Sequence, residues 1–227
     1  MKAKAVSSFS RKTENGKRKT VFIILLLAAA LAWGCGRAPQ LPPQKAKVIQ
    51  VIDGDTLVLA GERRVRLLSI DAPEMARKGR PAQFMAYKAK AYLAQLTRGK
   101  EVRLEYGQLR YDHYGRLLAH VFLADNTLVE AALLRQGLAH VYIHPPNIRY
   151  REVLLAAQKE AMDARRGIWR KALNQDEPFY LVNRNTLRFH RPGCPHAKKI
   201  APANRGKISS LKQAYLEGLS PCRSCQP

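Results

Sequence analysis

The chain has 227 residues, of which 46% are hydrophobic, and its formal net charge at pH 7 is +23. This length excludes a single small module, since it accommodates about two folding units, and a unit of about 120 residues can bury a real hydrophobic core. The charge favours a polyanionic partner, nucleic acid first. Solubility or adhesion to an acidic membrane is the alternative explanation.

The first 35 residues have the pattern of a signal peptide. Met1–Lys19 contains seven Lys or Arg and one acid, and the thirteen residues Val21–Trp33 are apolar and uncharged. The apolar run is shorter than the ~20 residues of a membrane span, which favours a signal sequence over an uncleaved anchor. Removing residues 1–35 would leave a net charge of +17, because that segment carries +6.

Cys35 ends the apolar region and resembles the lipidated cysteine of bacterial lipoproteins. A simple secreted form is the alternative. The Pro-rich residues 36–46 are expected to be an extended tether. We therefore expect an exported protein of the cell envelope or the extracellular space, anchored to a membrane by its N-terminal lipid.

The central stretch VIDGDTLVLAGERRVRLLSIDAPE brings together carboxylates and an arginine. Its apolar alternation predicts strands over Val48–Leu59 and Val65–Ile70. Side chains two apart in a strand share a face, so Asp53 and Asp55 point the same way. The loop 71–74 follows, presenting two further carboxylates. Oxygen ligands for a hard metal beside a phosphate-binding cation predict phosphodiester hydrolysis.

The rest of this region predicts a mixture of helices and strands. Apolar periodicity and terminal Gly or Pro residues indicate three helices, over 80–96, 127–136 and 149–166. Alternation indicates strands over 101–106 and 116–123, with a loop at 111–115 between them. Within the second helix, Glu130 is expected to be structural, bonding backbone or a nearby arginine.

Four motifs, IDGDT, RLLSIDAPE, DHYGR and EAALLRQGLA, occur in an order that resembles the staphylococcal nuclease family. The resemblance covers residues 47–170. It implies an OB-fold, a five-stranded Greek-key β-barrel with three helices. It also implies a Ca²⁺-dependent endonuclease that acts on DNA, RNA or both.

The resemblance also assigns roles to individual residues. Asp55, Asp71 and the Ala72 carbonyl would hold Ca²⁺, with Asp53 nearby. Glu74 would orient or deprotonate the attacking water, and Arg66 and Arg116 would bind the phosphate. The implied substrate-binding residues, which contact phosphate or pack on a nucleotide, are His113, Tyr114 and Tyr142.

After a linker at residues 171–178, the segment 179–227 has the ligand spacing of a zinc site. His190 and Cys194 form an H-x₃-C pair, and Cys222 and Cys225 form a C-x₂-C pair. Tetrahedral Zn²⁺ takes such N and S ligands, and a module below fifty residues needs such a crosslink. A Cys222–Cys225 disulfide is the alternative in an oxidising compartment, and His196 is a weaker ligand candidate.

This C-terminal segment resembles the zinc domain of the Ada DNA-repair methyltransferases. In that domain a metal-bound cysteine accepts a methyl group from DNA. His190 stands at that position here, and imidazole is not the thiolate nucleophile that the transfer requires. We therefore expect a small zinc-stapled α+β domain that aids nucleic-acid docking without methyl transfer.

Two functions follow from these observations. The first is an exported calcium-dependent nuclease, monomeric and without a protein partner. The second is a noncatalytic DNA-capture lipoprotein. The cluster of Asp55, Asp71 and Glu74 favours the first, because without a metal these carboxylates would repel phosphate.

Overall fold

The computed structural model describes residues 42–77 and 79–227. The expected signal peptide, its Cys35 and residues 36–41 of the tether lie outside this range. Within the described residues, no helix is long and apolar enough to cross a membrane.

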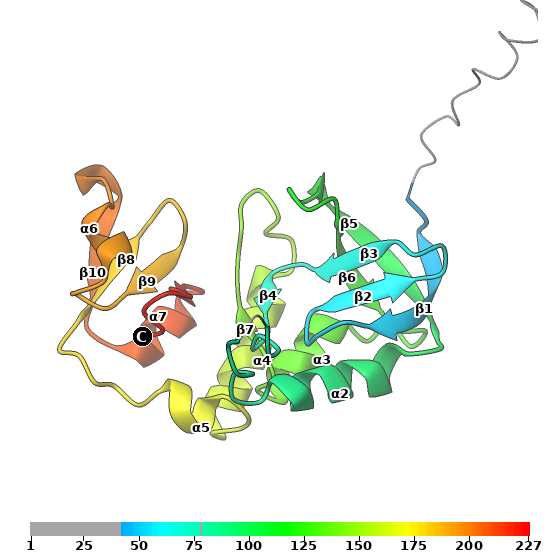
Figure 1. Cartoon of the computed structure of the whole chain (residues 1–227), viewed down its shortest axis with the longest axis horizontal. Helices are drawn as coiled ribbons and strands as arrows, with labels where there is room; N and C mark the ends of the chain where they lie inside the picture. The colour runs from blue at the N-terminus through cyan, green and yellow to red at the C-terminus, as the bar shows by residue number, and fades with distance from the viewer. Residues whose placement is uncertain (1–41, 78) are drawn as a thin grey trace, which may run out of the picture. The chain divides into compact units, whose positions relative to one another are not determined.

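A closed five-stranded barrel forms the first part of the described chain (Figure 1). Its strands are β1 (Lys45–Val51), β2 (Thr56–Leu59), β3 (Arg64–Leu67), β5 (Glu101–Tyr111) and β6 (Leu117–Phe122). The order around the barrel is β1-β2-β3-β6-β5, and β3 pairs with β6 in parallel. The expected OB-type barrel is confirmed. β1 begins at Lys45, so residues 45–46 belong to the barrel and not to the tether.

The segment 48–59, predicted as one strand, is two strands joined by a turn. Gly54 lies in this turn, where a Cβ would come within 2.6 Å of the Ala72 Cβ and 2.7 Å of the Ala89 Cβ. Only glycine therefore lets the turn pack this closely. The turn places Asp53 and Asp55 beside the segment that follows the short strand β4 (Ile70–Asp71).

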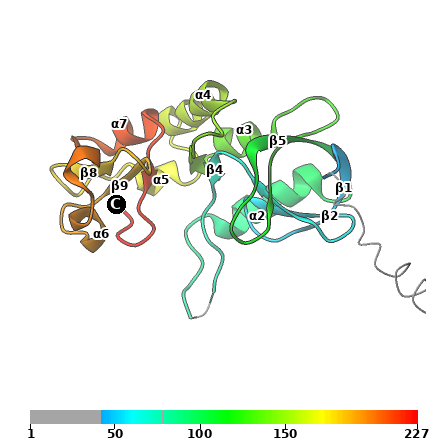
Figure 2. The same ribbon diagram turned by 90° about the horizontal axis from the view of Figure 1, so that it is seen from above.

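Three helices pack with the barrel, namely α2 (Ala86–Thr97), α3 (Val129–Arg135) and α4 (Arg151–Asp163). Their buried side chains share one core with the barrel interior. The first helix was predicted from residue 80 but starts at Ala86, because Met85 has a left-handed φ of 71°. Residues 74–77 and 79–85, before this helix, extend away from the barrel (Figure 2).

The C-terminal part contains a four-stranded sheet of order β10-β8-β9-β11. Its elements are β8 (Tyr180–Asn183), β9 (Arg188–His190), α6 (Pro195–Lys198), η1 (Pro202–Asn204), β10 (Arg205–Ile208), α7 (Leu211–Leu216) and β11 (Ser220–Pro221). Its core includes Ala161 and Met162 of α4 and Trp169 of α5 (Trp169–Ala172). The barrel part and the C-terminal part therefore share a helix and a core.

Buried hydrogen bonds also join the two parts at β7 (His140–Val141), which pairs with β4. The Val141 N–H donates to Gln158 Oε1 at 2.7 Å, and Ser220 Oγ donates to the Val141 carbonyl at 3.0 Å. Gln158 Nε2 donates in turn to the Tyr215 carbonyl at 2.7 Å. Because buried polar groups are expensive to leave unpaired, these bonds fix where the tail meets the barrel.

Candidate active site and metal centre

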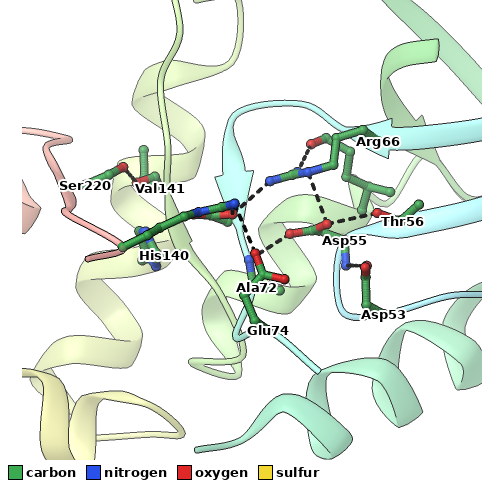
Figure 3. Close-up of polar contacts among 12 residues, drawn as sticks. Asp53, Asp55, Thr56, Arg66, Ala72, Glu74, His140, Val141 and Ser220 are labelled. Atoms are coloured by element: carbon green, nitrogen blue, oxygen red, sulfur yellow. Dashed lines mark hydrogen bonds and ion pairs between the residues drawn. The ribbon is translucent and has the colours of Figure 1, made fainter. Parts of the chain in front are cut away.

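Asp55 and Asp71 both contact one buried arginine, Arg66. Figure 3 shows Arg66 beside Asp55. Arg66 Nε lies 3.1 Å from Asp55 Oδ1, and its NH2 lies 3.0 Å from Asp71 Oδ1. The Ala72 N–H donates to Asp55 Oδ2 at 2.9 Å. Asp55 thus comes from the turn before β2 and Arg66 from β3, while β4 supplies Asp71 and leads into Ala72.

Burial gives the two carboxyl groups different electrostatics. Burial raises the pKa of Asp55 to about 7, against the opposing effect of Arg66. Burial alone would also raise the pKa of Asp71. The positive charges of Arg66, His140 and Arg223 outweigh burial, however, and hold the pKa of this carboxyl group below its usual range.

The donor set suits a hard divalent cation. Asp55, Asp71 and the Ala72 carbonyl offer oxygen atoms from adjoining segments, and Ca²⁺ takes carboxylate and backbone carbonyl oxygens. A cation there would also favour the charged form of Asp55, which burial disfavours. Asp53 adds structure to this turn, since its Oδ1 accepts from the Asp55 N–H at 3.1 Å.

Glu74 lies at the exposed edge of the cluster. Its backbone N–H donates to Gln83 Oε1 at 2.7 Å, which fixes the local chain. Its side chain is 50% exposed, and its Oε1 lies 3.0 Å from Arg223 NH1. The carboxylate is therefore accessible to water but already paired with a cation.

Arg116 is linked to the acidic cluster through Thr56. Its NH1 donates to Thr56 Oγ1 at 3.4 Å, and Thr56 Oγ1 donates to Asp55 Oδ1 at 3.1 Å. Asp112 holds the guanidinium from the other side, accepting from Nε at 2.7 Å. Arg66 directly, and Arg116 through Thr56, are therefore linked to the same oxygen atom, Asp55 Oδ1.

The three expected substrate-binding residues fall in two places. His113 and Tyr114 lie together on the exposed β5–β6 loop, with ring centroids 3.7 Å apart. The Arg116 guanidinium lies 5.5 Å from the Tyr114 ring centroid. Tyr142 follows β7 instead, and the Arg188 guanidinium lies 4.6 Å from its ring centroid.

Sequence reasoning missed two residues that contact Asp71. Arg223 binds both oxygens of this carboxylate, with Nε 3.2 Å from Oδ2 and NH2 2.5 Å from Oδ1. His140 Nε2 lies 4.0 Å from Oδ2. The sequence shows that Arg223 lies between Cys222 and Cys225. No local pattern indicated that this loop meets a carboxylate 152 residues earlier.

Glu130 has the structural role expected from the sequence. Its carboxylate is fully buried and accepts from the Val121 N–H at 3.2 and 3.3 Å. His120 Nδ1 lies 3.3 Å from its Oε1. The partners are backbone and a histidine, with no arginine among them.

His190, Cys194, Cys222 and Cys225 form one cluster in the C-terminal part. Their ligand atoms lie within 4.8 Å of one another, and no disulfide joins the three cysteines. A tetrahedral ion with Zn–S bonds of about 2.3 Å needs sulfur atoms about 3.8 Å apart, so small movements suffice to bind it. The weaker candidate His196 is not part of the cluster.

Cys194 lies at the N-terminus of α6, which suits a thiolate ligand. Burial alone would raise the pKa of its thiol, but the backbone N–H groups of Ala197 and His196 outweigh burial and lower it. Burial raises the pKa of Cys225 to about 12. A thiolate there requires a compensating cation.

Comparisons with known proteins agree with this geometry. The sequence profile of the family described as "Staphylococcal nuclease homologue" matches residues 64–171. "Thermonuclease" of Staphylococcus intermedius is 37% identical over 127 residues, 55% of this chain and 75% of the relative. "Thermonuclease" of Staphylococcus hyicus is 35% identical over 129 residues, or 56% and 76%. "Probable endonuclease LCL3" of Schizophyllum commune is 38% identical over 130 residues, or 50% and 42%.

Proposed function

Since the chain belongs to the staphylococcal nuclease family, we propose that it is a calcium-dependent endonuclease that hydrolyses phosphodiester bonds of DNA, RNA or both. The observation that carries the proposal is the buried cluster of Asp55, Asp71 and Arg66, with Arg116 one hydroxyl group away. A protein that only binds nucleic acid gains nothing from burying two carboxylates beside its phosphate-binding arginines.

The roles of the side chains follow from their chemistry. Asp55, Asp71 and the Ala72 carbonyl would hold Ca²⁺, which when bound polarises a phosphoryl oxygen. Arg66 uses three of its five N–H groups on Asp55, Asp71 and the Leu67 carbonyl, so two are left for a phosphate. Arg116 supplies the second guanidinium. Fixed positive charge at the developing oxyanion is the largest expected contribution to catalysis.

Glu74 would position the attacking water and accept its proton. The carboxylate is exposed, so placement by Gln83 and the loop matters more than basicity. For this role its contact with Arg223 must open or admit a water molecule. His113, Tyr114 and Tyr142 would contact the nucleotides on either side of the reacting phosphate.

The C-terminal cluster would bind one structural Zn²⁺ through His190, Cys194, Cys222 and Cys225. The bound module would dock nucleic acid without accepting a methyl group, because an imidazole replaces the nucleophilic thiolate.

Export through the N-terminal signal and lipidation of Cys35 would place the enzyme at the cell envelope. Labelling of cells with a radioactive fatty acid tests that placement. We expect the wild type to carry the label and Cys35→Ser to lack it.

Digestion of single-stranded DNA, duplex DNA and RNA tests the nuclease. We expect cleavage with calcium, loss of cleavage when calcium is omitted, and recovery when it is restored. Asp55→Asn should lower the rate by at least about 100-fold, because it removes a charged ligand at the reacting phosphate.

Asp163→Asn is the matched control, since it makes the same chemical change at an exposed site at the end of α4. Its rate should stay near that of the wild type. Tight binding of DNA without cleavage under any calcium concentration would favour the noncatalytic capture protein.

A further inference from the structure

A cleft of about 550 Å³ lies where the segment after β7 meets the C-terminal part. Tyr142 and His144 line one side, and Arg188, Lys199 and Arg223 line the other. None of its lining residues is Asp or Glu. Arg223 is paired with Asp71 and Glu74, but Arg188 and Lys199 have no ion pair among the described residues. Their positive charges in a cleft without a lining carboxylate favour a polyanionic ligand.

The cleft is continuous with the candidate active site through Arg223. This side chain lines the cleft, and its guanidinium also contacts Asp71 and Glu74. A strand bound with its reacting phosphate at the acidic cluster would thus have the cleft next to it, on the far side of Arg223.

The cleft also has an aromatic surface that is held in place. The Arg188 guanidinium lies 4.6 Å from the Tyr142 ring centroid, and its NH1 donates to the Pro221 carbonyl at 2.9 Å. Because Arg188 lies over one face of the Tyr142 ring, an unpaired base can stack on the guanidinium plane or on the other face of the ring.

We infer that this cleft binds the single-stranded part of a polynucleotide next to the reacting phosphate. The inference rests on the proposed nuclease and adds a second binding region contributed mainly by the C-terminal part. The shared core and the Val141 hydrogen bonds hold its two sides together. A substrate with an unpaired stretch is then preferred over a fully paired duplex.

Two neighbouring lysines test the inference. Lys199 lines the cleft and Lys198 does not, while both are exposed and differ by one position. Lys199→Glu and Lys198→Glu change the net charge of the protein equally. A difference between their binding affinities therefore reports whether the substituted residue lies in the cleft. Binding of a fluorescent 20-nucleotide strand and of a blunt duplex would be measured by anisotropy in calcium-free buffer at several salt concentrations.

We expect Lys199→Glu to weaken single-strand binding at least about fivefold more than Lys198→Glu. The slope of log K against log salt concentration should also be smaller for Lys199→Glu by about one, because one fewer counterion is released. The difference should shrink for the duplex and for a dinucleotide. Equal effects of the two variants on the strand would overturn the inference.

Cleavage by the wild type, measured in parallel with calcium, separates the two proposals. If the wild type cleaves and the two variants weaken binding equally, the nuclease proposal stands and the proposed binding role of the cleft is refuted. If Lys199→Glu alone weakens strand binding and the wild type does not cleave, the cleft stands as a strand-binding site and the nuclease proposal is refuted.

Discussion

Arg223 and the proposed calcium ion would share the same carboxylate, that of Asp71. The guanidinium occupies both oxygens of Asp71, and the paired carboxylate raises the pKa of Arg223 further above its usual range. Arg223 is about half exposed, so this ion pair is only moderately strong. It is nevertheless placed to compete with a metal.

Arg223→Ala should therefore tighten calcium binding by about threefold to tenfold, corresponding to the loss of an ion pair of about 1 kcal/mol. Calorimetric titration of calcium measures this without depending on catalysis. Arg184→Ala, an exposed arginine in the same part of the chain, is the control. Unchanged or weaker calcium binding in Arg223→Ala would show that the two cations do not compete.

At the residue scale, local pattern could predict what local geometry determines. Asp55 lies just before β2, Arg66 on β3 and Asp71 on β4, close together in the sequence, and their convergence follows from strand alternation and tight turns. Arg223 and His140 reach the same carboxylate through tertiary packing. Such contacts leave no periodic signal near either residue, which is why they were missed.

The contact between α3 and β6 depends on a buried acid. Burial raises the pKa of Glu130 above its ordinary value of 4.5, while His120 and the Val121 N–H oppose the shift. Because the folded-state pKa is the higher one, the folded protein binds this proton more tightly than the unfolded chain. The resulting stability is complete below about pH 4.5 and is lost as pH rises through the folded-state pKa.

Glu130→Gln cannot titrate and keeps an oxygen to accept from Val121. Wild type should thus lose free energy of unfolding relative to Glu130→Gln as the pH rises from 4.5 to 8. Urea denaturation at several pH values measures the difference. Glu152→Gln, an exposed substitution on α4, accounts for effects of net charge. A difference that is constant with pH would contradict this account.

At the element scale, boundaries were predicted less well than element types. Alternation indicated β5 only to residue 106, but pairing with β6 extends it to Tyr111. Apolar periodicity placed the first helix too early, since the left-handed Met85 delays its start. Both differences arise from partners that a local window of sequence does not contain.

At the scale of the whole molecule, composition suggested two independent units. The shift at residues 171–178 is real, yet Trp169 is fully buried against Tyr215 and the tail core, with ring centroids 4.8 Å apart. The linker therefore joins two parts that fold against each other. Composition does not predict such packing, because the residues on both sides are ordinary core residues.

The zinc site should consequently affect the entire protein. Cys222→Ser should reduce zinc content from about one ion per chain to near zero and lower Tm by about 5–10 °C. It should also lower nuclease activity, because the proposed strand-binding cleft depends on the same loop. Elemental analysis, thermal melting and digestion assays measure the three effects.

Ser224→Ala, within the same loop, should keep its zinc. A wild-type protein without zinc, or a Cys222→Ser protein with unchanged Tm, would contradict the structural role of the metal.

The position of Arg223 between two proposed zinc ligands, Cys222 and Cys225, has a thermodynamic consequence. The loop that would hold one metal also presents the competitor for the other. Linkage between binding sites is reciprocal, so any factor by which zinc changes the affinity for calcium is the factor by which calcium changes the affinity for zinc. The two ions would then act as mutual effectors, and neither dissociation constant is defined until the concentration of the other ion is stated.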